Sequence, residues 1–270
     1  MHKGILAVCV SVLIVSGTVV AQGANISIAI QLHRDTESDG SLTYYAMPSA
    51  GYDASVSTLD VVSPTGWYKF NNGGGSSFNS SDPNTVLTNV KGDWSVTVDK
   101  GLGTERDYTF NVNADAVNPA IWLPAIVVTS ITHNQALALP PAAIAFNNPG
   151  IFDWGYSNLY GPAGYPGNNA HVAGDAVSLV PGNPINLPGD YNFNIQFYTN
   201  AAPDVVFGDA ALTGTAPGET PDDVFTFNAI YASIGYRSFS VVDVPEPASM
   251  TLLTVGALGA FGFIRRKKMN

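Results

Sequence analysis

The eight-residue run Tyr191-Asn-Phe-Asn-Ile-Gln-Phe-Tyr198 alternates large apolar side chains with polar ones. Successive side chains of an extended strand point to opposite faces, so the apolar members at alternate positions share one face. Equally regular alternation recurs in three segments closer to the N-terminus: residues 26–32, 94–98 and 108–112. Between the two ends of the chain we find no segment with the 3.6-residue period of an amphipathic helix. The body of the protein is therefore predicted to be all-β.

Turn-forming pairs separate these runs and indicate the architecture. Glycine and proline account for 27 and 18 of the 270 residues, which disfavours long helices. Six pairs lie where strands are expected to reverse: Asp39-Gly40, Lys100-Gly101, Pro149-Gly150, Pro166-Gly167, Pro181-Gly182 and Pro188-Gly189. This pattern favours one or two antiparallel β-sandwich domains of the immunoglobulin-like or jelly-roll-like type. A loop-like stretch before a new strand at Ile126 indicates a boundary, which gives domains at 22–124 and 125–243.

Residues 1–21 have the features of a secretory signal peptide. Lys3 supplies one positive charge, the next 17 residues carry none, and the small residues Val19 and Ala21 suit cleavage after Ala21. The only cysteine, Cys9, lies inside this segment. The exported body is therefore expected to have no thiol, no disulfide and no cysteine-ligated metal.

The C-terminus combines a short motif, an apolar segment and a basic cluster. They follow one another as Pro245-Glu246-Pro247, the uncharged residues 248–264, and Arg265-Arg266-Lys267-Lys268. At about 1.5 Å per residue, a helix over the apolar segment would be about 26 Å long, which predicts a transmembrane helix at 248–264. The basic cluster is predicted to stop transfer and to stay in the cytoplasm, which places the body outside.

Together with the signal peptide, these parts resemble the PEP-CTERM sorting signal of Gram-negative exporters, also known as the ice-binding protein C-terminal domain. The resemblance covers about the last 27 residues. It implies that a membrane-embedded exosortase recognises Pro245, Glu246 and Pro247, and that the basic cluster is the stop. It also implies cleavage near the motif and transfer to the cell envelope or extracellular matrix, often in strains that make exopolysaccharide. Such tails occur on many unrelated bodies, so the activity of this body stays open.

The body is strongly acidic. Residues 22–243 hold six Lys and Arg residues against 20 Asp and Glu residues, a net charge of −14. This charge repels DNA, RNA and anionic lipid, so no nucleic acid is expected as a partner. It suits solubility outside the cell, or screening by divalent cations.

No catalytic motif is found in the sequence. A Gly-x-Ser-x-Gly elbow, a P-loop and a dinucleotide-binding glycine fingerprint are all absent. The three histidines of the body, His33, His133 and His171, have none of the spacings typical of zinc sites. Glutamates, the usual residues of glycoside hydrolysis together with aspartates, are few. We therefore predict no catalytic residues and no cofactor other than calcium, considered next.

The acidic segment Asp35-Thr-Glu37-Ser-Asp39-Gly40 has two interpretations. Carboxylates at alternate positions before a glycine resemble the opening of a calcium-binding loop. The twelfth position is Ala46, however, so the bidentate glutamate of such loops is missing. The interpretation that we favour is a solvated hairpin with an Asp-Gly turn.

Four aromatic residues, Trp154, Tyr156, Tyr160 and Tyr165, lie close together in the Gly- and Pro-rich stretch 152–167. This stretch is predicted to be a loop, and exposed rings in the loops of a sandwich stack on the apolar faces of sugars. The other interpretation is burial in the core, which is the commoner place for aromatic rings.

These features predict an exported, non-enzymatic β-sandwich protein of the cell envelope or extracellular matrix, with an adhesive or structural role. One alternative is a carbohydrate-binding module for exopolysaccharide, and another is a secreted hydrolase. The expected partners are an exosortase-type sorting protease and, through the tail, the inner membrane.

Overall fold

A computed structural model describes residues 23–71, 77–201, 203–207 and 223–243. The predicted signal peptide, 1–21, and the sorting tail, 244–270, with its predicted transmembrane helix at 248–264, lie outside the described residues. Within the described ranges, no helix has the length and apolar character needed to cross a membrane.

Strands form most of the described secondary structure, which confirms the all-β prediction. The largest sheet has eight strands, in the order β11 (Asn168–Ala173), β10 (Trp154–Tyr160), β13 (Gly189–Ala201), β14 (Val224–Val241), β1 (Asn25–Thr36), β2 (Leu42–Tyr52) and β5 (Phe78–Ser80), with β8 (Gln135–Leu137) beside the end of β14. A second sheet has the order β4 (Lys69–Asn71), β3 (Leu59–Val62), β6 (Gly92–Val98) and β7 (Arg106–Val112). A third consists of β12 (Ser178–Leu179) and β9 (Ile144–Ala145).

Three short helical segments complete the described structure: α1 (Pro83–Val90), the 3-10 turn η1 (Pro119–Ile121) and α2 (Pro203–Phe207). The sequence analysis did not predict α1. Asp82 caps this helix by accepting a hydrogen bond from the backbone N–H of Asn84 at 3.0 Å, and Pro83 occupies its first turn. Its eight residues are too few for a clear helical period in the sequence.

The largest sheet is mixed, which corrects the prediction of purely antiparallel sheets. β1 pairs in parallel with β14 over twelve positions, from Asn25 beside Val224 to Thr36 beside Gly235. β8 also lies parallel to β14, whereas β2 and β13 run antiparallel to their neighbours. Alternation in a sequence shows which side chains share a face, but it does not show the direction of the neighbouring strand.

The faces predicted from alternation are buried in two hydrophobic cores. The first core lies between the β1–β2 part of the large sheet and the four-stranded sheet, where Ile28, Trp94 and Phe110 are buried. The second core lies between the β13–β10 part of the large sheet and the β9–β12 pair, where Phe193 and Ile195 are buried. β14 contributes side chains to both cores. Two cores therefore do not by themselves establish two domains, and the predicted division at residue 124 stays a prediction.

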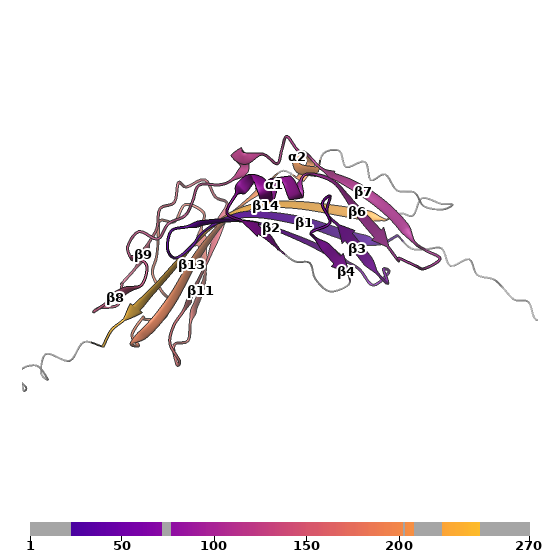
Figure 1. The fold of residues 1–270 in the computed structure, drawn as a ribbon. Coiled ribbons are helices and arrows are strands. Elements are labelled where there is room, and N and C mark those ends of the chain that lie inside the picture. The colour runs from indigo at the N-terminus through magenta and orange to yellow at the C-terminus, as the bar shows by residue number, and fades with distance from the viewer. Residues whose placement is uncertain (1–22, 72–76, 202, 208–222, 244–270) are drawn as a thin grey trace, which may run out of the picture.

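β14 is the element that connects the two cores. Its 18 residues span about 60 Å at about 3.3 Å per residue. Its first part pairs with β1, and its later part pairs with β13 over thirteen positions. Figure 1 shows this strand running from one half of the molecule into the other, with a bend between them.

The segment that contains Ile126 and Val128 crosses β14 where the two cores meet. An added Cβ atom at Gly235 would lie 2.6 Å from the carbonyl oxygen of Ile126, so only glycine allows this close approach. The backbone N–H of Ile126 donates to Ser233 Oγ at 3.3 Å, and Arg237 Nη2 donates to the carbonyl oxygen of Val128 at 3.2 Å. These contacts fix the connecting segment across the strand.

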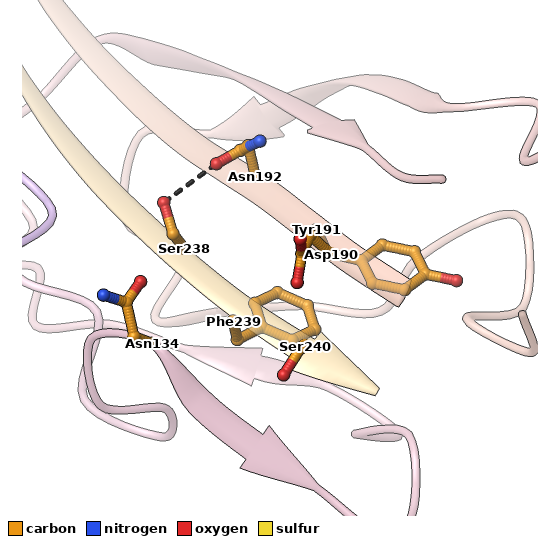
Figure 2. A pocket seen from close by; sticks show the side chains of 7 residues that line it. All are labelled: Asn134, Asp190, Tyr191, Asn192, Ser238, Phe239 and Ser240. Carbon is orange, nitrogen blue, oxygen red and sulfur yellow. Dashed lines mark hydrogen bonds between the residues drawn. The ribbon is translucent and has the colours of Figure 1, made fainter. Parts of the chain in front are cut away.

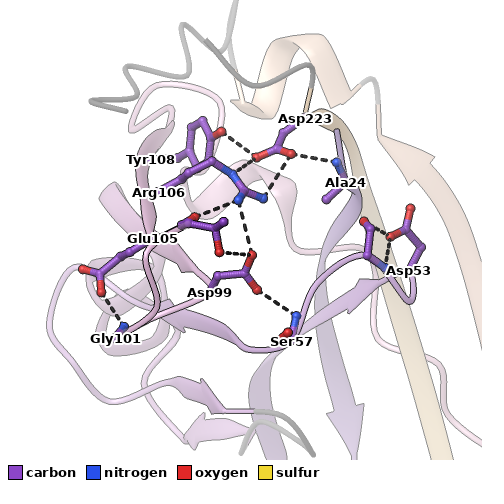
Figure 3. A network of polar contacts seen from close by, with 11 residues as sticks. Ala24, Asp53, Ser57, Asp99, Gly101, Glu105, Arg106, Tyr108 and Asp223 are labelled. Carbon is purple, nitrogen blue, oxygen red and sulfur yellow. Dashed lines mark hydrogen bonds and ion pairs between the residues drawn. The ribbon is translucent and has the colours of Figure 1, made fainter. Parts of the chain in front are cut away.

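A polar network links the residues just before β14 and β1 (Figure 3). Asp223 accepts hydrogen bonds from Arg106 Nε at 2.7 Å, from the Tyr108 hydroxyl at 2.6 Å and from the backbone N–H of Ala24 at 2.7 Å. Arg106 Nη1 also lies 3.3 Å from a carboxylate oxygen of Asp99. Burial raises the pKa of the Asp223 carboxyl, but the hydrogen bonds from Arg106, Ala24 and Tyr108 outweigh it and hold this pKa below its usual range.

Because β14 is shared, we expect the two cores to unfold together. Phe110→Ala in the first core and Phe193→Ala in the second should each lower the free energy of unfolding by about 3–5 kcal/mol, the cost of a cavity left by a buried ring. Calorimetry should show one transition, shifted by either substitution. Two separate transitions, of which each variant moves only one, would contradict this coupling.

The network at Asp223 should be strongly stabilising. Asp223→Asn removes the nearer of the two carboxylates that pair with the buried guanidinium of Arg106, which should cost about 3 kcal/mol at neutral pH in urea unfolding. Because the pKa of Asp223 is lowered on folding, this contribution is present above about pH 4 and is lost as the pH falls through the folded pKa. The exposed Asp115→Asn is the matched control, and an equal loss in the two variants would refute the assignment.

Candidate functional site

One face of the large sheet points away from both hydrophobic cores. In β13 the core receives Tyr191, Phe193, Ile195 and Phe197, so the even-numbered side chains between them lie on the opposite face. The register carries this opposite face across six neighbouring strands, from β11 to β2. We call it the polar–aromatic face and define it by these residues: Gln31, His33, Asp35, Tyr45, Met47, Trp154, Tyr156, Asn158, Tyr160, His171, Asn192, Asn194, Gln196, Tyr198, Ala232, Ile234, Tyr236 and Ser238.

A row of rings crosses this face. Directly paired positions of five strands place Trp154, Tyr198, Ala232, His33 and Tyr45 side by side. The indole of Trp154 stacks on the Tyr198 ring, with centroids 4.1 Å apart and planes 16° from parallel. The imidazole of His33 stacks on the Tyr45 ring, with centroids 4.8 Å apart and planes 5° from parallel. The stacked pairs limit ring rotation, so the orientations of these four rings are fixed.

A buried carboxylate anchors the next row. Asp35 Oδ1 lies 2.7 Å from His33 Nδ1, and Asp35 Oδ2 accepts a hydrogen bond from the Tyr236 hydroxyl at 3.3 Å. The side chains of His33 and Asp35 are only 6% and 4% exposed. Both oxygens of the carboxylate are thus partnered, as burial of a charge requires.

Asp35 also influences the ionisation of the surrounding phenols. Burial, and after it the negative charge of Asp35, raise the pKa of Tyr236, Tyr198 and Tyr45 above the usual range. The phenols therefore stay neutral at ordinary pH, and each keeps a proton that can be donated in a hydrogen bond.

Amide side chains form a connected ladder beside the rings. Asn194 Oδ1 accepts from Asn158 Nδ2 at 3.0 Å and from Gln196 Nε2 at 3.2 Å. Gln196 Oε1 in turn accepts a hydrogen bond from the Tyr198 hydroxyl. The ladder orients these amides before any ligand is bound.

An open pocket of about 330 Å³ continues the face toward the end of β14. Its lining residues are Asn134, Asp190, Tyr191, Asn192, Ser238, Phe239 and Ser240. Figure 2 shows the polar side chains of Asn192, Ser238 and Asn134 around it, with the hydroxyl of Ser238 donating to Asn192 Oδ1 at 2.8 Å. The pocket thus offers a carboxylate, amides and hydroxyls in one place.

Three of the four predicted sugar-stacking residues lie on the polar–aromatic face. Trp154, Tyr156 and Tyr160 occupy alternate positions of one strand, β10, so their side chains point to the same side. Trp154 is 39% exposed and Tyr160 is 55% exposed. The prediction of a loop at 152–167 is wrong for residues 154–160, because Gly and Pro flank this strand and obscure its alternation.

The fourth residue, Tyr165, lies elsewhere. Its ring packs edge-on against Tyr191 at 5.1 Å, and its hydroxyl donates to the carbonyl oxygen of Asn183 at 3.2 Å. It therefore supports the second core and does not join the other three rings. The turn after β10 directs it to the core side of the sheet.

The three calcium candidates do not share one site. Asp35 is engaged with His33 on the polar–aromatic face, whereas Asp39 Oδ1 accepts from the backbone N–H and the hydroxyl of Ser41 at 2.9 Å and 2.7 Å. Glu37 and Asp39 lie in the hairpin between β1 and β2, as the favoured interpretation predicts. In the described part of the chain, no three His, Cys, Asp or Glu side chains gather in a group suited to a metal ion. Calcium binding stays a prediction.

The sequence analysis missed most of the face. His33, Tyr45, Tyr198 and Tyr236 come from four strands that are far apart in the chain, and no local pattern connects them. The available signal was the alternation itself: Ile26, Ile28, Ile30 and Leu32 share the buried face, so Gln31 and His33 lie on the opposite one.

Comparisons with known proteins identify the tail and leave the body unassigned. Residues 243–267 match the family model of the PEP-CTERM protein-sorting motif. The chain carries a PEP-CTERM sorting motif. This PEP-CTERM motif confirms the resemblance seen at Pro245, Glu246 and Pro247, and it implies an exported protein that is sorted by an exosortase. A comparison with curated proteins finds no match.

Solved structures similar to the body are distant. A two-domain fibronectin type-III segment from chicken tenascin is 19% identical, with 62% of this chain and 88% of that chain covered and a TM-score of 0.19. The BSP domain of a biofilm-associated protein is 12% identical, with coverages of 82% and 30% and a TM-score of 0.20. The yeast delta-COP-I mu-homology domain is 10% identical, with coverages of 81% and 97% and a TM-score of 0.26. At these scores the similarities carry no argument about function.

The charge of Asp35 should be visible in an alkaline titration. Because folding raises the pKa of Tyr236, Tyr198 and Tyr45, their stabilising contribution is complete below about pH 10 and is lost as the pH rises through the folded pKa. Asp35→Asn removes the negative charge, so tyrosinate absorbance should appear at lower pH than in the wild type. Asp39→Asn, in the neighbouring hairpin, should leave the curve unchanged. Identical curves for Asp35→Asn and wild type would disprove the electrostatic role of Asp35.

Proposed function

We propose that this protein is exported, processed at its PEP-CTERM motif and delivered to the cell envelope or extracellular matrix, where its body has a non-enzymatic adhesive role. The observation that carries the proposal is the PEP-CTERM match at residues 243–267, on a body that presents a broad polar–aromatic face. Before processing, the apolar segment 248–264 anchors the chain in the inner membrane, with Arg265 to Lys268 on the cytoplasmic side. An exosortase is then the processing partner.

The way the body joins the tail supports this order of events. β14 ends at Val241, and only three residues separate it from Pro245. A tail that follows a paired strand so closely holds the body near the membrane until the motif is cleaved. Cleavage at the motif would fall beyond Val241, the last residue of β14, and would leave the sheet intact.

The adhesive role rests on the character of the polar–aromatic face. Clusters of exposed aromatic rings are typical of binding surfaces, because a partner that covers such rings removes apolar area from water. Trp154 and Tyr160 are the exposed aromatic residues of β10, and the ordered amides of Asn194 and Gln196 lie beside them. Rings combined with oriented polar groups suit a surface that holds a partner.

The non-enzymatic assignment rests on the state of His33 and Asp35, the hydrogen-bonded pair of titratable groups on this face. His33 and Asp35 are paired with each other and are almost fully buried, so neither is placed to exchange a proton with a bound molecule. Turnover of glycosidase or esterase substrates by the purified protein would contradict this part of the proposal and would favour the secreted hydrolase.

Sorting should depend on the motif. Glu246→Ala removes the only charged residue of the recognition element, so unprocessed protein should accumulate in the membrane fraction, detected by an antibody against the body. Glu219→Ala, a change of the same type outside the motif, should be processed normally. Release of Glu246→Ala into the matrix at the wild-type rate would show that sorting does not depend on recognition of the motif.

A further inference from the structure

We propose that the polar–aromatic face, together with the pocket at its end, binds an uncharged polysaccharide chain. The inference rests on the adhesive role proposed above and adds the chemical class of the ligand. The sequence predicted only that aromatic rings could stack on sugars. The structure adds three features along which a polysaccharide could lie: rings projecting from one strand, a ladder of amides and a pocket.

The rings form a track of the right kind. Trp154, Tyr156 and Tyr160 all project from one face of β10, and six residues of strand place the first and last about 20 Å apart. This length accommodates several linked sugar units. The C–H surface of a sugar ring packs on an aromatic face, and Tyr160 enters none of the aromatic pairs found among the described residues, so its ring surface is available.

The pocket begins where the ring track ends. Tyr160 is paired with Asn192, and Asn192 is paired with Ser238, so the last ring and the polar pocket are neighbours across three adjacent strands. Asn192, Ser238 and Asn134 offer both donors and acceptors, and Asp190 adds a charged acceptor. Sugar hydroxyls both donate and accept hydrogen bonds, so this mixture is complementary to them.

Charge selects between classes of polysaccharide. None of the residues that define the face or line the pocket is Lys or Arg, and Asp190 places a negative charge in the pocket. The whole body carries a net charge of −14 between residues 22 and 243. Uronate or sulfate groups would therefore be repelled and would find no cation to pair with. An uncharged chain meets no such penalty.

The face is ordered before binding. Stacking fixes Trp154 on Tyr198 and His33 on Tyr45, and the amide ladder fixes Asn194 and its neighbours. A ligand therefore does not have to order these side chains itself, which lowers the entropic cost of binding. This arrangement favours a long, repetitive ligand that gains many weak contacts along a fixed surface.

The test uses the processed protein isolated from the producing strain. The probe is that strain's matrix polysaccharide, freed of protein and separated by anion exchange into an uncharged and an acidic fraction. In affinity electrophoresis the wild type should be retarded by the uncharged fraction and not by the acidic one. Trp154→Ala and Tyr160→Ala should each weaken the retardation about tenfold, and Asn192→Ala should weaken it as well.

Leu139→Ala is the control, since Leu139 is 78% exposed and lies outside the face. Thermal unfolding tests whether each variant is folded. Tyr160 is 55% exposed, so Tyr160→Ala is expected to fold even if Trp154→Ala does not. Binding to neither fraction, equal binding to both, or retardation unchanged in folded Tyr160→Ala overturns the ligand class.

Adhesion of the same proteins to intact matrix is measured in parallel, and it separates this inference from the proposed function. If the face variants lose adhesion although the wild type binds no uncharged polysaccharide, the adhesive role stands and the ligand class is wrong. If adhesion is unaffected by the face variants, the adhesive role of the face fails as well.

Discussion

β14, the last strand among the described residues, is paired along both of its edges, and the rest of the architecture depends on this pairing. β1 pairs with its first part and β13 with its later part, so the first strand of the body and a strand from the second half share one neighbour. Each half supplies the apolar side chains of its own core, but neither core is complete without β14. A strand of 18 residues, rather than a flexible linker, thus determines how the two halves are arranged.

The same strand creates the candidate site. Side chains alternate along it, so the positions that complete the cores leave Ala232, Ile234 and Tyr236 on the opposite face. The small side chain of Ala232 lies between the rings of Tyr198 and His33, and Tyr236 reaches the carboxylate of Asp35. The cores and the polar–aromatic face are therefore two sides of one sheet, and the surface is as rigid as the sheet that carries it.

Local alternation in the sequence predicted which side chains share one face of a strand. It did not predict which strands pair, or in which direction. Alternation correctly predicted which side chains of residues 191–198 are buried, because a strand of either direction buries the same face. It did not reveal that β1 and β14 are parallel, nor that residues 154–160 form a strand among glycines and prolines. Trp154, Tyr156 and Tyr160 could be named because they are close in sequence. His33 and Tyr198 could not, since only the sheet register brings them to the same row.

The direction in which β14 leaves the body has a mechanical consequence. Its start lies beside the start of β1, and its other end leads within three residues into the sorting motif. A pull on the C-terminal end, opposed by a partner held on the sheet, acts along the strand axis. The backbone hydrogen bonds to β1 and β13 lie across that axis, so they resist in shear and share the tension instead of opening one after another. A force applied at this end of β14 is therefore resisted by many hydrogen bonds at once, and the sheet does not unravel from this strand.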